Sequence, residues 1–260
     1  MSIEPVKLVT LTQLMTNVEL GNKCKVVKGS VIDKEQRASI AFVKHLPPRA
    51  ILIECLAALI ARNIGLPAPR PMLVNVSPVK IPSLNLSQNS IFFGSEDVGF
   101  PSLAQITENR FIAHKLSSWP HLLTAGCFDE WIANSDRHTG NIIYDGGTFS
   151  LIDHSHAIQK GHHFDQPTDQ NSFLEIARPK ARNDLLTHNL RRKAEKAVRE
   201  FKKLSTEDWR ALTSYNLYCD ENKAKEVIIF LKNRLDFLTQ LIAQKLGDKQ
   251  IDLYASSGYQ

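Results

Sequence analysis

The stretch ANSDRHTGNIIYDGGTFSLIDHSHA, residues 133–157, decides how this chain folds. It holds three Asp, three His and two Asn between short apolar runs. Two apolar alternations flank an Asp-Gly-Gly turn in NIIYDGGTFSLID (141–153), and this pattern predicts a short β-hairpin. Asp136 lies on the loop that enters the hairpin, and Asp153 directly follows its second strand. We therefore expect the polar groups to lie at the same end of the hairpin.

Asp136, Asn141 and Asp153 together fit the chemistry of phosphoryl transfer. That reaction needs a carboxylate to accept the proton of an attacking hydroxyl, and oxygen ligands for Mg²⁺. Each residue alone could be an ordinary turn residue, because Asp and Asn favour loops. An aspartate directly after two apolar strand residues is, however, a poor place for a carboxylate without a partner. Their joint placement favours a functional interpretation.

A second pair of charged residues lies far upstream. AFVK (41–44) ends a β-rich run with Lys44, and Glu54 lies inside the most apolar helical pattern, PPRAILIECLAALIARNIGLP (47–67). The neighbours of Glu54 at helical spacing are small or apolar, so an unpaired carboxylate there would be costly. Lys44 is the candidate partner, and Arg62 or solvent is the alternative. A strand lysine held by a helix glutamate positions ATP in protein-kinase-like folds.

Five segments, in chain order, resemble the HipA-like kinases, more specifically their compact single-domain group: AFVKHL, IECLAALIARNIGLPAP, IFFGSEDVG, WIANSDRHTGN and LIDHSHA. A more distant resemblance is to phosphatidylinositol 3- and 4-kinases, which share a DRHxxN loop. The resemblance implies an α+β, two-lobed protein-kinase-like fold, with a small β-rich N-lobe bearing one helix and a larger, mainly helical C-lobe. We expect a single HipA-like kinase domain over 1–260, with lobes at about 1–95 and 96–260.

The resemblance also implies site residues. Asp136 would be the catalytic base, Lys44 would contact the ATP phosphates, and Glu54 would hold Lys44. Asn141 and Asp153 would bind Mg²⁺. The adenine would meet the segment near 92–99, including Phe92, Phe93, Gly94, Ser95 and Glu96. Backbone amides of Gly29 and Ser30 would bind phosphate, although KGSVIDKEQRAS (28–39) lacks a GxGxxG pattern.

The implied activity is ATP- and Mg²⁺-dependent phosphorylation of a Ser or Thr hydroxyl of a protein. The family includes toxins of bacterial toxin–antitoxin pairs, and here the antitoxin or regulatory protein would be a separate chain. Two alternatives stay open: a phosphatidylinositol-type or small-molecule kinase, and a catalytically inactive nucleotide-binding or nucleic-acid-interacting module. Ser30 is one candidate for autophosphorylation.

The remaining patterns predict the other elements. β-rich runs at 24–32 and 37–46 predict an antiparallel hairpin, 69–79 a strand, and 83–99 a connection between the lobes. Helical periodicity is present at 103–116, 121–134, 184–203 and 222–246. The last of these places five apolar residues on one stripe: Ile228, Leu231, Leu235, Leu238 and Ile242.

Composition is that of an ordinary globular protein, with 43% hydrophobic and 23% charged residues. The longest apolar run, 51–61, is far shorter than the roughly 20 residues that span a bilayer, and the N-terminal sequence has no secretory pattern. We expect a cytoplasmic protein without a membrane partner. Cys55 and Cys127 lie in apolar helical patterns and Cys24 and Cys219 are scattered, so no disulfide framework is expected.

A zinc site is a rival interpretation of the histidines His138, His154, His156, His162 and His163. Alternating histidines on a strand point to opposite sides, and no cysteine lies nearby. We expect instead that His138 braces the catalytic loop by hydrogen bonding and that residues 154–163 line a mobile segment.

The segment 178–203 has ten Lys or Arg against three Asp or Glu, within a net charge of +5 for the chain. Such a helix can meet nucleic-acid phosphates. Because acids are interspersed along an amphipathic pattern, a solvated face is the favoured interpretation. A tRNA-bound, lipid or acidic protein partner is a further alternative for this basic surface.

Overall fold

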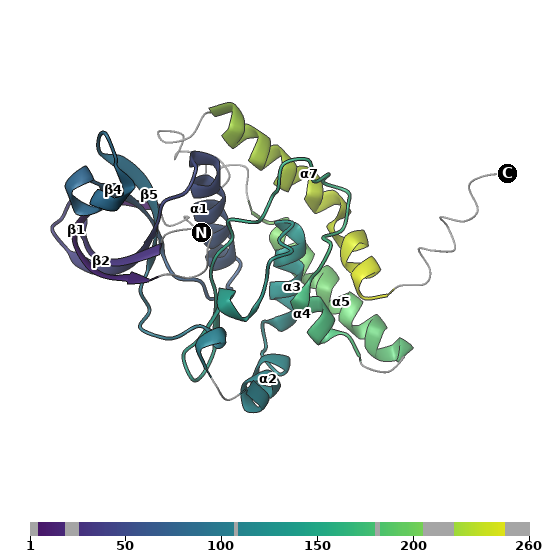
Figure 1. The fold of residues 1–260 in the computed structure, drawn as a ribbon. Helices are drawn as coiled ribbons and strands as arrows, with labels where there is room; N and C mark the ends of the chain where they lie inside the picture. Colours follow the sequence, from purple (N-terminus) through teal and green to yellow (C-terminus); the bar gives the residue numbers. More distant parts are fainter. Residues whose placement is uncertain (1–4, 19–25, 107–108, 180–182, 205–220, 248–260) are drawn as a thin grey trace. The chain divides into compact units, whose positions relative to one another are not determined.

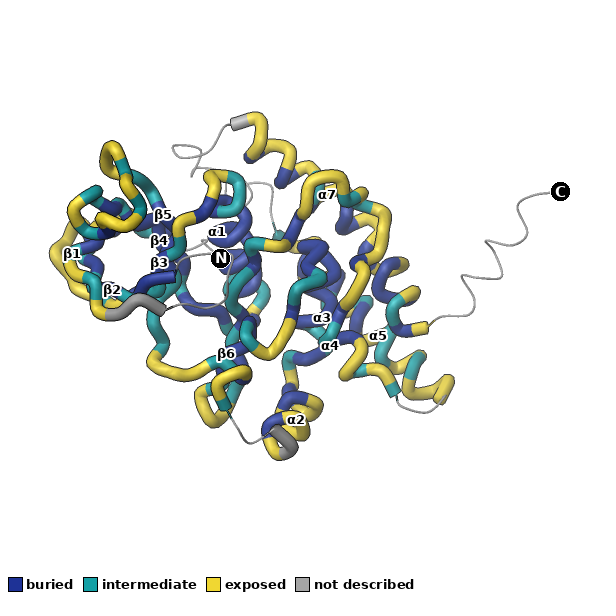
Figure 2. The backbone as a smooth tube through the Cα atoms, viewed as in Figure 1, coloured by how far each residue is buried: buried dark blue, intermediate teal, exposed yellow. Residues whose placement is uncertain are grey.

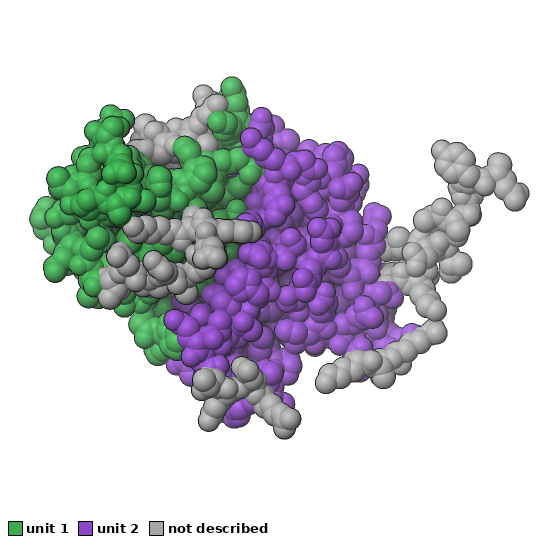
Figure 3. Space-filling model, viewed as in Figure 1, with its two compact units in different colours: residues 1–101, 150–155, 206–225 green, residues 102–149, 156–205, 226–260 purple. Residues whose placement is uncertain are grey.

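The computed structural model describes residues 5–18, 26–106, 109–179, 183–204 and 221–247 (Figure 1). They form two compact units, coloured separately in Figure 3. Unit 1 comprises residues 1–101, 150–155 and 206–225, and unit 2 comprises residues 102–149, 156–205 and 226–260. The expected single kinase domain with lobes meeting near residue 95 stays a prediction.

Unit 1 is built on a closed five-stranded barrel in the order β1-β2-β3-β5-β4. The strands are β1 (Lys7–Val18), β2 (Val26–Ile32), β3 (Ala38–Lys44), β4 (Pro71–Val76) and β5 (Ser90–Glu96). A parallel pairing of β1 with β4 closes the barrel, and the other neighbours are antiparallel. The barrel core contains inward-facing apolar side chains, among them Leu11, Val31, Val43, Val74 and Phe92.

The hairpin predicted from the runs at 24–32 and 37–46 is confirmed as β2 and β3, paired from Val26↔Lys44 to Ile32↔Ala38. Asp33 closes its turn, because Oδ1 accepts hydrogen bonds from the backbone N–H groups of Glu35 and Arg37. The predicted strand at 69–79 is confirmed as β4. The twelve-residue β1 was not predicted.

The interpretation of 83–99 as a connection between lobes is wrong for its second half. After two 3₁₀ turns, η1 (Pro78–Lys80) and η2 (Pro82–Leu84), residues 90–96 form β5, which pairs with both β3 and β4. Phe92 and Phe93 are 1% and 4% exposed. A strand buried on both faces lacks the alternation that reveals a half-buried one, and polar turn residues on both sides of IFF conceal it further.

The predicted helix in 47–67 is confirmed as α1 (Pro48–Asn63). Two prolines begin it, at positions where no helical partner for N–H is needed. Gly65, with φ of +81°, follows its end. Every residue from 51 to 61 is buried, so α1 is apolar all round, as an interior helix is. Cys55 lies in this buried stretch, as predicted.

After Pro101 the chain is mainly helical. The elements are η3 (Leu103–Gln105), α2 (Asn109–Ser117), α3 (Leu122–Trp131), η4 (Thr139–Asn141), β6 (Ile142–Tyr144), β7 (Phe149–Leu151), α4 (Ser172–Ala177), α5 (Asp184–Phe201) and α7 (Glu221–Lys245). β6 and β7 form the predicted hairpin with shorter strands. The helix predicted over 103–116 is divided between η3 and α2, and α4 was not predicted.

Helices α3, α5 and α7 contribute buried side chains to unit 2. The predicted stripe on α7 is confirmed, since all five of its residues are buried. The Trp131 indole at the end of α3 donates to the Leu231 carbonyl at 2.9 Å and stacks on Phe201 of α5. Figure 2 shows buried backbone along these helices and exposed backbone over much of α5. The basic side of α5 is exposed, as its amphipathic pattern predicts, and whether it binds a partner stays a prediction.

Two sequence expectations concern membranes and cysteines. No helix among the described residues combines the length and the apolar character that a membrane crossing requires. Cys127 of α3 is buried, as predicted, and burial raises the pKa of its thiol well above the ordinary range. Cys24 and Cys219 lie outside the described residues.

Replacing Gly29 by Ala is expected to destabilise the protein by about 1–3 kcal/mol, because the site is already filled. Gly29 lies in the middle of β2, where an added Cβ would sit 2.6 Å from Leu11 Cδ1 and 2.8 Å from the Gln13 carbonyl oxygen. Urea unfolding measures the effect. Gly147→Ala is the control, since its Cβ would meet only Asp145 Oδ1, at 3.6 Å. Equal stability of both variants would contradict the close packing of β1 on β2.

Candidate active site

Lys44 lies at the end of β3 between two carboxylates of unit 1. Its Nζ is 3.3 Å from Glu54 Oε1 and 2.8 Å from Asp153 Oδ2. The predicted pairing of Lys44 with Glu54 is confirmed. The alternative partner, Arg62, instead donates to the Ala68 carbonyl at 2.7 Å. The direct contact of Lys44 with Asp153 was not predicted.

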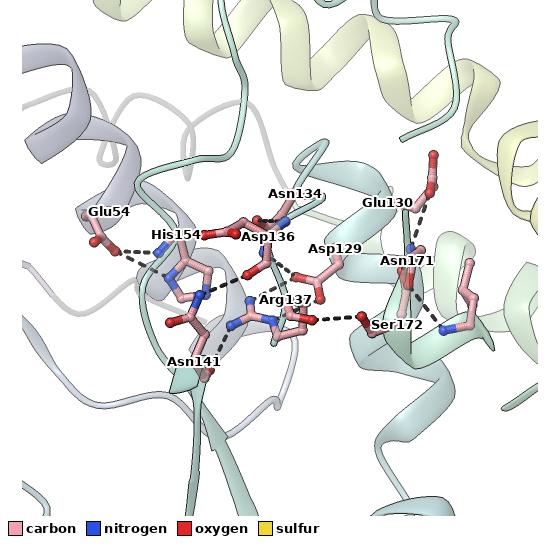
Figure 4. Close-up of polar contacts among 12 residues, drawn as sticks. Glu54, Asp129, Glu130, Asn134, Asp136, Arg137, Asn141, His154, Asn171 and Ser172 are labelled. Carbon is pink, nitrogen blue, oxygen red and sulfur yellow. Dashed lines mark hydrogen bonds and ion pairs between the residues drawn. The ribbon is translucent and has the colours of Figure 1, made fainter. Parts of the chain in front are cut away.

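Glu54 has a second partner through its other oxygen. Oε2 accepts a hydrogen bond from the His154 backbone N–H at 2.8 Å, and His154 Nδ1 lies 3.6 Å away (Figure 4). One buried carboxylate of α1 therefore holds both Lys44 and the backbone next to Asp153. His154 is 1% exposed, so the expectation that it lines a mobile segment is wrong. Glu54, which the sequence predicted as the partner of Lys44, thus also holds His154 in place.

Asp153 has a left-handed backbone, with φ of +56°. This conformation is uncommon for a residue with a side chain, although aspartate tolerates it better than most. Ser155 Oγ donates to Asp153 Oδ1 at 2.8 Å, and Lys44 contacts Oδ2. The side chain remains 31% exposed. Both oxygens are thus positioned by neighbours while the carboxylate stays open to solvent.

Burial and charge have opposite effects on the pKa values of this group. Burial of Asp153 raises its pKa, but the charge of Lys44 and hydrogen bonds from Lys44 and Ser155 lower it more, so the pKa lies well below its ordinary value. Burial of Lys44 lowers its pKa, and the charges of Glu54 and Asp153 raise it above the ordinary value. Two carboxylates face one ammonium group, an arrangement that attracts a further cation.

This pKa shift predicts a dependence of stability on pH. A carboxyl group whose pKa is lowered by folding stabilises the folded state above its unfolded pKa of about 3.9 and loses that contribution as the pH falls below it. The Asp153→Asn variant should therefore lose less stability than wild type on acidification below about pH 4. Urea unfolding at a series of pH values measures this. Asp169→Asn, at an exposed position, should follow wild type; identical pH profiles for all three proteins would contradict the assigned shift.

Asp136 and Asn141 lie on the loop of unit 2 that leads into β6. The Asp136 backbone N–H donates to Asn134 Oδ1 at 3.2 Å, and Asn141 Nδ2 donates to the Asp136 carbonyl at 2.9 Å. These bonds hold the loop through its backbone and do not use the Asp136 carboxylate. The bond from Asn141 uses its amide nitrogen, so its amide oxygen is the atom that could bind a cation.

A buried ion pair supports the same loop. Arg137 Nε and Nη2 donate to the two oxygens of Asp129, at 3.0 and 2.9 Å, and both side chains are 1% exposed. Arg137 Nη1 also donates to the Asn141 carbonyl, and Ser172 Oγ donates to the Arg137 carbonyl (Figure 4). Sequence reasoning missed Asp129. The signal was available, since Asp129 lies inside an apolar helix just as Glu54 does.

His138 braces this loop as predicted, because its Nδ1 accepts a hydrogen bond from the Gly140 backbone N–H at 3.0 Å. His162 and His163 lie in the segment after β7, half-buried and exposed respectively. Within the described part of the chain, no three His, Cys, Asp or Glu side chains are grouped to hold a metal ion. The geometry therefore offers no support for the rival zinc site.

Apart from Lys44, the residues of unit 1 that were predicted to contact the nucleotide lie in strands β2 and β5 of the barrel. Gly29 and Ser30 lie in the middle of β2 and pair with strands on both sides, so they are not part of a loop. Phe92, Phe93 and Gly94 are buried, and their contact with adenine stays a prediction. Ser95 and Glu96, half-buried at the end of β5, are the accessible part of that segment.

These features define a class of protein. A strand lysine paired with a helix glutamate, in a strand-rich N-terminal part, and an Asp-Arg-His loop in a helical C-terminal part are typical of protein-kinase-like folds. The family model described as HipA-like kinase matches residues 34–233, and the chain belongs to this family of kinases. The predicted α+β kinase-like fold and the resemblance to HipA-like kinases are both confirmed.

A solved structure supports the kinase-like fold. The chain is similar to the proinflammatory kinase CtkA of Helicobacter pylori, with 14% identity, 92% of this chain and 99% of that chain covered, and a TM-score of 0.55. The chain is less similar to the Rio2 kinase–ADP/Mg²⁺-phosphoaspartate complex of Chaetomium thermophilum, with 13% identity, 90% of this chain and 71% of that chain covered, and a TM-score of 0.40. It is also less similar to a LepB fragment of Legionella pneumophila, with 14% identity, 80% of this chain and 44% of that chain covered, and a TM-score of 0.43. No curated protein matches the sequence.

Proposed function

We propose that this kinase transfers the γ-phosphoryl group of ATP, with Mg²⁺, to a Ser or Thr hydroxyl of a protein. The observation that carries the proposal is Lys44 at the end of β3, in contact with both Glu54 and Asp153. A buried helix carboxylate that holds a strand lysine presents a fixed ammonium group to phosphate oxygens. Membership of the HipA-like family supports the reaction class.

The donor set fits magnesium. Mg²⁺ prefers oxygen ligands and is often held by one or two carboxylates together with substrate phosphates. Asp153 offers a carboxylate that is fixed by Lys44 and Ser155 and still partly exposed. Asn141 offers an amide oxygen, since its nitrogen is bonded to the Asp136 carbonyl. Magnesium bound by either residue would neutralise charge on the nucleotide phosphates.

Asp136 is the proposed base. Its carboxylate would orient the acceptor hydroxyl and take its proton as the acceptor oxygen bonds to the γ-phosphorus. The bond between that phosphorus and the β,γ-bridging oxygen breaks, and ADP leaves with the electron pair. Asn134 and Asn141 hold the backbone of Asp136, and the buried Asp129–Arg137 pair keeps the loop in place.

Incubation with γ-labelled ATP tests the proposal. Wild-type protein with Mg²⁺ should label itself or a protein in a lysate, at phosphoserine or phosphothreonine. Addition of EDTA should abolish labelling, because the phosphates and Asp153 lose the cation between them. Asp153→Asn should reduce the label and raise the Mg²⁺ concentration needed. Labelling that persists unchanged in EDTA, or label found only in lipid or a small molecule, would contradict the proposal.

A more specific proposal is that the protein acts as a toxin, which concerns the identity of the phosphate acceptor. If the acceptor is part of the translation machinery, induced expression of wild-type protein should arrest growth of a bacterial host, and Asp136→Asn should not. Growth that is unaffected by active wild-type protein would separate kinase activity from toxicity.

A further inference from the structure

Helix α5 of unit 2 carries a stripe of four basic residues on its exposed side. Arg192, Lys193, Lys196 and Arg199 are all exposed, and their spacing places them along one side of a helix. The other side of α5 is buried through Ala194, Val198 and Phe201. The helix is therefore fixed in the unit by its apolar side and presents this basic stripe outward.

The stripe borders a hollow of about 730 Å³, which we call the α5 hollow. Besides the four basic residues, its lining includes aliphatic side chains, namely Ala177, Pro179, Leu186 and Leu190. Leu186 is 49% exposed, and its neighbour Leu185 is 70% exposed. An open hollow that combines exposed aliphatic side chains with positive charge is unusual for a surface that serves only to face water.

The stripe keeps an excess of positive charge over the acids of the same helix, although the charges of Lys196 and Arg199 contribute to lowering the pKa of Glu200. Glu200 forms its ion pair with Lys203, at 2.7 Å, and Lys202 pairs with Asp236 of α7. Within the described residues, no ion pair includes any of the four basic residues of the stripe. Glu195 is the one acidic residue in the described lining of the hollow. The positive charge there is thus available to an external anion.

We propose that the α5 hollow binds an acidic, amphipathic peptide segment of a partner protein. Aliphatic side chains of the segment would pack on Leu186 and Leu190, and its carboxylates would lie against the four basic residues, in the mode by which amphipathic helices bind grooves. A nucleic-acid strand fits less well. The described lining contains no aromatic side chain on which bases could stack, and phosphate contacts alone do not require an aliphatic surface.

A labelled synthetic peptide tests this proposal. The probe is about 14 residues long, enough for roughly four helical turns, with Leu at every third or fourth position and Glu elsewhere. Fluorescence anisotropy with the full chain should show saturable binding that weakens with salt. A peptide with Gln in place of Glu, and one with Ala in place of Leu, should each bind at least about tenfold more weakly.

Variants of the protein locate the binding. Arg192→Gln combined with Lys196→Gln should weaken binding by about tenfold or more, and Leu186→Ala by a smaller factor. The control, Lys34→Gln combined with Lys223→Gln, removes the same charge at exposed positions outside the hollow and should bind like wild type. Asp136→Asn should also bind like wild type, which separates this proposal from the proposed kinase activity.

Several outcomes would overturn the proposal. These are no binding at millimolar peptide, equal binding of the Gln peptide, or equal loss in the test and control variants. A further outcome comes from measuring the binding of single-stranded RNA and of duplex DNA in parallel. The hollow would be assigned to nucleic acid instead if either nucleic acid bound more tightly than the peptide and its binding depended on the basic stripe. In that case the magnitude of the slope of log K against log salt should fall by about two in the Arg192→Gln, Lys196→Gln variant.

Discussion

Asp136→Asn is expected to lower the rate of phosphoryl transfer by about 10²- to 10⁴-fold, because the variant keeps the shape of the side chain and loses the proton acceptor. Folding and ATP binding should be unchanged. The bonds that hold the loop use the Asp136 backbone, from Asn134 and to Asn141, and these remain in the variant. Single-turnover transfer of label from ATP measures the rate, and nucleotide titration measures binding.

Asp169→Asn is the matched control for this experiment. Asp169 is exposed in unit 2, and the same isosteric change there should leave the rate at the wild-type value. If Asp136→Asn transferred phosphate at the wild-type rate, Asp136 would not be the base. If it lost ATP binding or unfolded at a lower temperature, the residue would have a structural role that the present contacts do not require.

Arg234→Met is expected to lower the free energy of unfolding by about 3–5 kcal/mol, because it leaves a buried carboxylate without its cation. Arg234 of α7 and Glu130 of α3 are both 0% exposed, with Nη2 and Oε1 3.0 Å apart. Arg234 Nε also donates to the Glu130 carbonyl, and Nη1 donates to the carbonyls of Phe164 and Gln166. One guanidinium thus satisfies acceptors from two parts of unit 2.

Urea unfolding of three variants separates the causes. Lys202→Met removes an exposed ion pair, 3.7 Å from Asp236, and should cost less than about 1 kcal/mol. Glu130→Gln combined with Arg234→Met removes both charges and should be less destabilised than Arg234→Met alone, since no unpaired carboxylate remains. A double variant that is as unstable as Arg234→Met alone, or less stable, would show that lost packing, and not the stranded charge, dominates.

Much of the fold could be predicted because its elements have clear periodicity and clear ends. Helix α1 begins at two prolines and ends before Gly65, and α7 shows a regular apolar stripe. Strand β1 escaped prediction because its pairing with β2 is irregular at two places, between Leu11 and Gln13 and between Leu14 and Thr16, which breaks the alternation of its side chains. Strand β5 escaped because both its faces are buried.

Some contacts of the candidate site could be predicted from the sequence and others could not. The Lys44–Glu54 pair could be predicted because a carboxylate inside an apolar helix requires a cation. The contact of Lys44 with Asp153 could not, because it depends on the left-handed backbone at Asp153, which sequence does not reveal for a residue other than glycine. The Asp129–Arg137 pair obeys the same rule as Glu54 and could have been found by applying that rule to α3.

Glu54 has a consequence for how nucleotide and metal ion affect each other. Its two oxygens serve two different partners, the Lys44 ammonium group and the His154 backbone N–H beside Asp153. A shift of α1 that releases one partner must also disturb the other. Occupancy at Lys44 and occupancy at Asp153 are therefore coupled through Glu54 as well as through the direct contact of Lys44 with Asp153, and by thermodynamic reciprocity each ligand should raise the affinity for the other by the same factor. Glu54→Gln would weaken that cooperativity even where each ligand still binds alone.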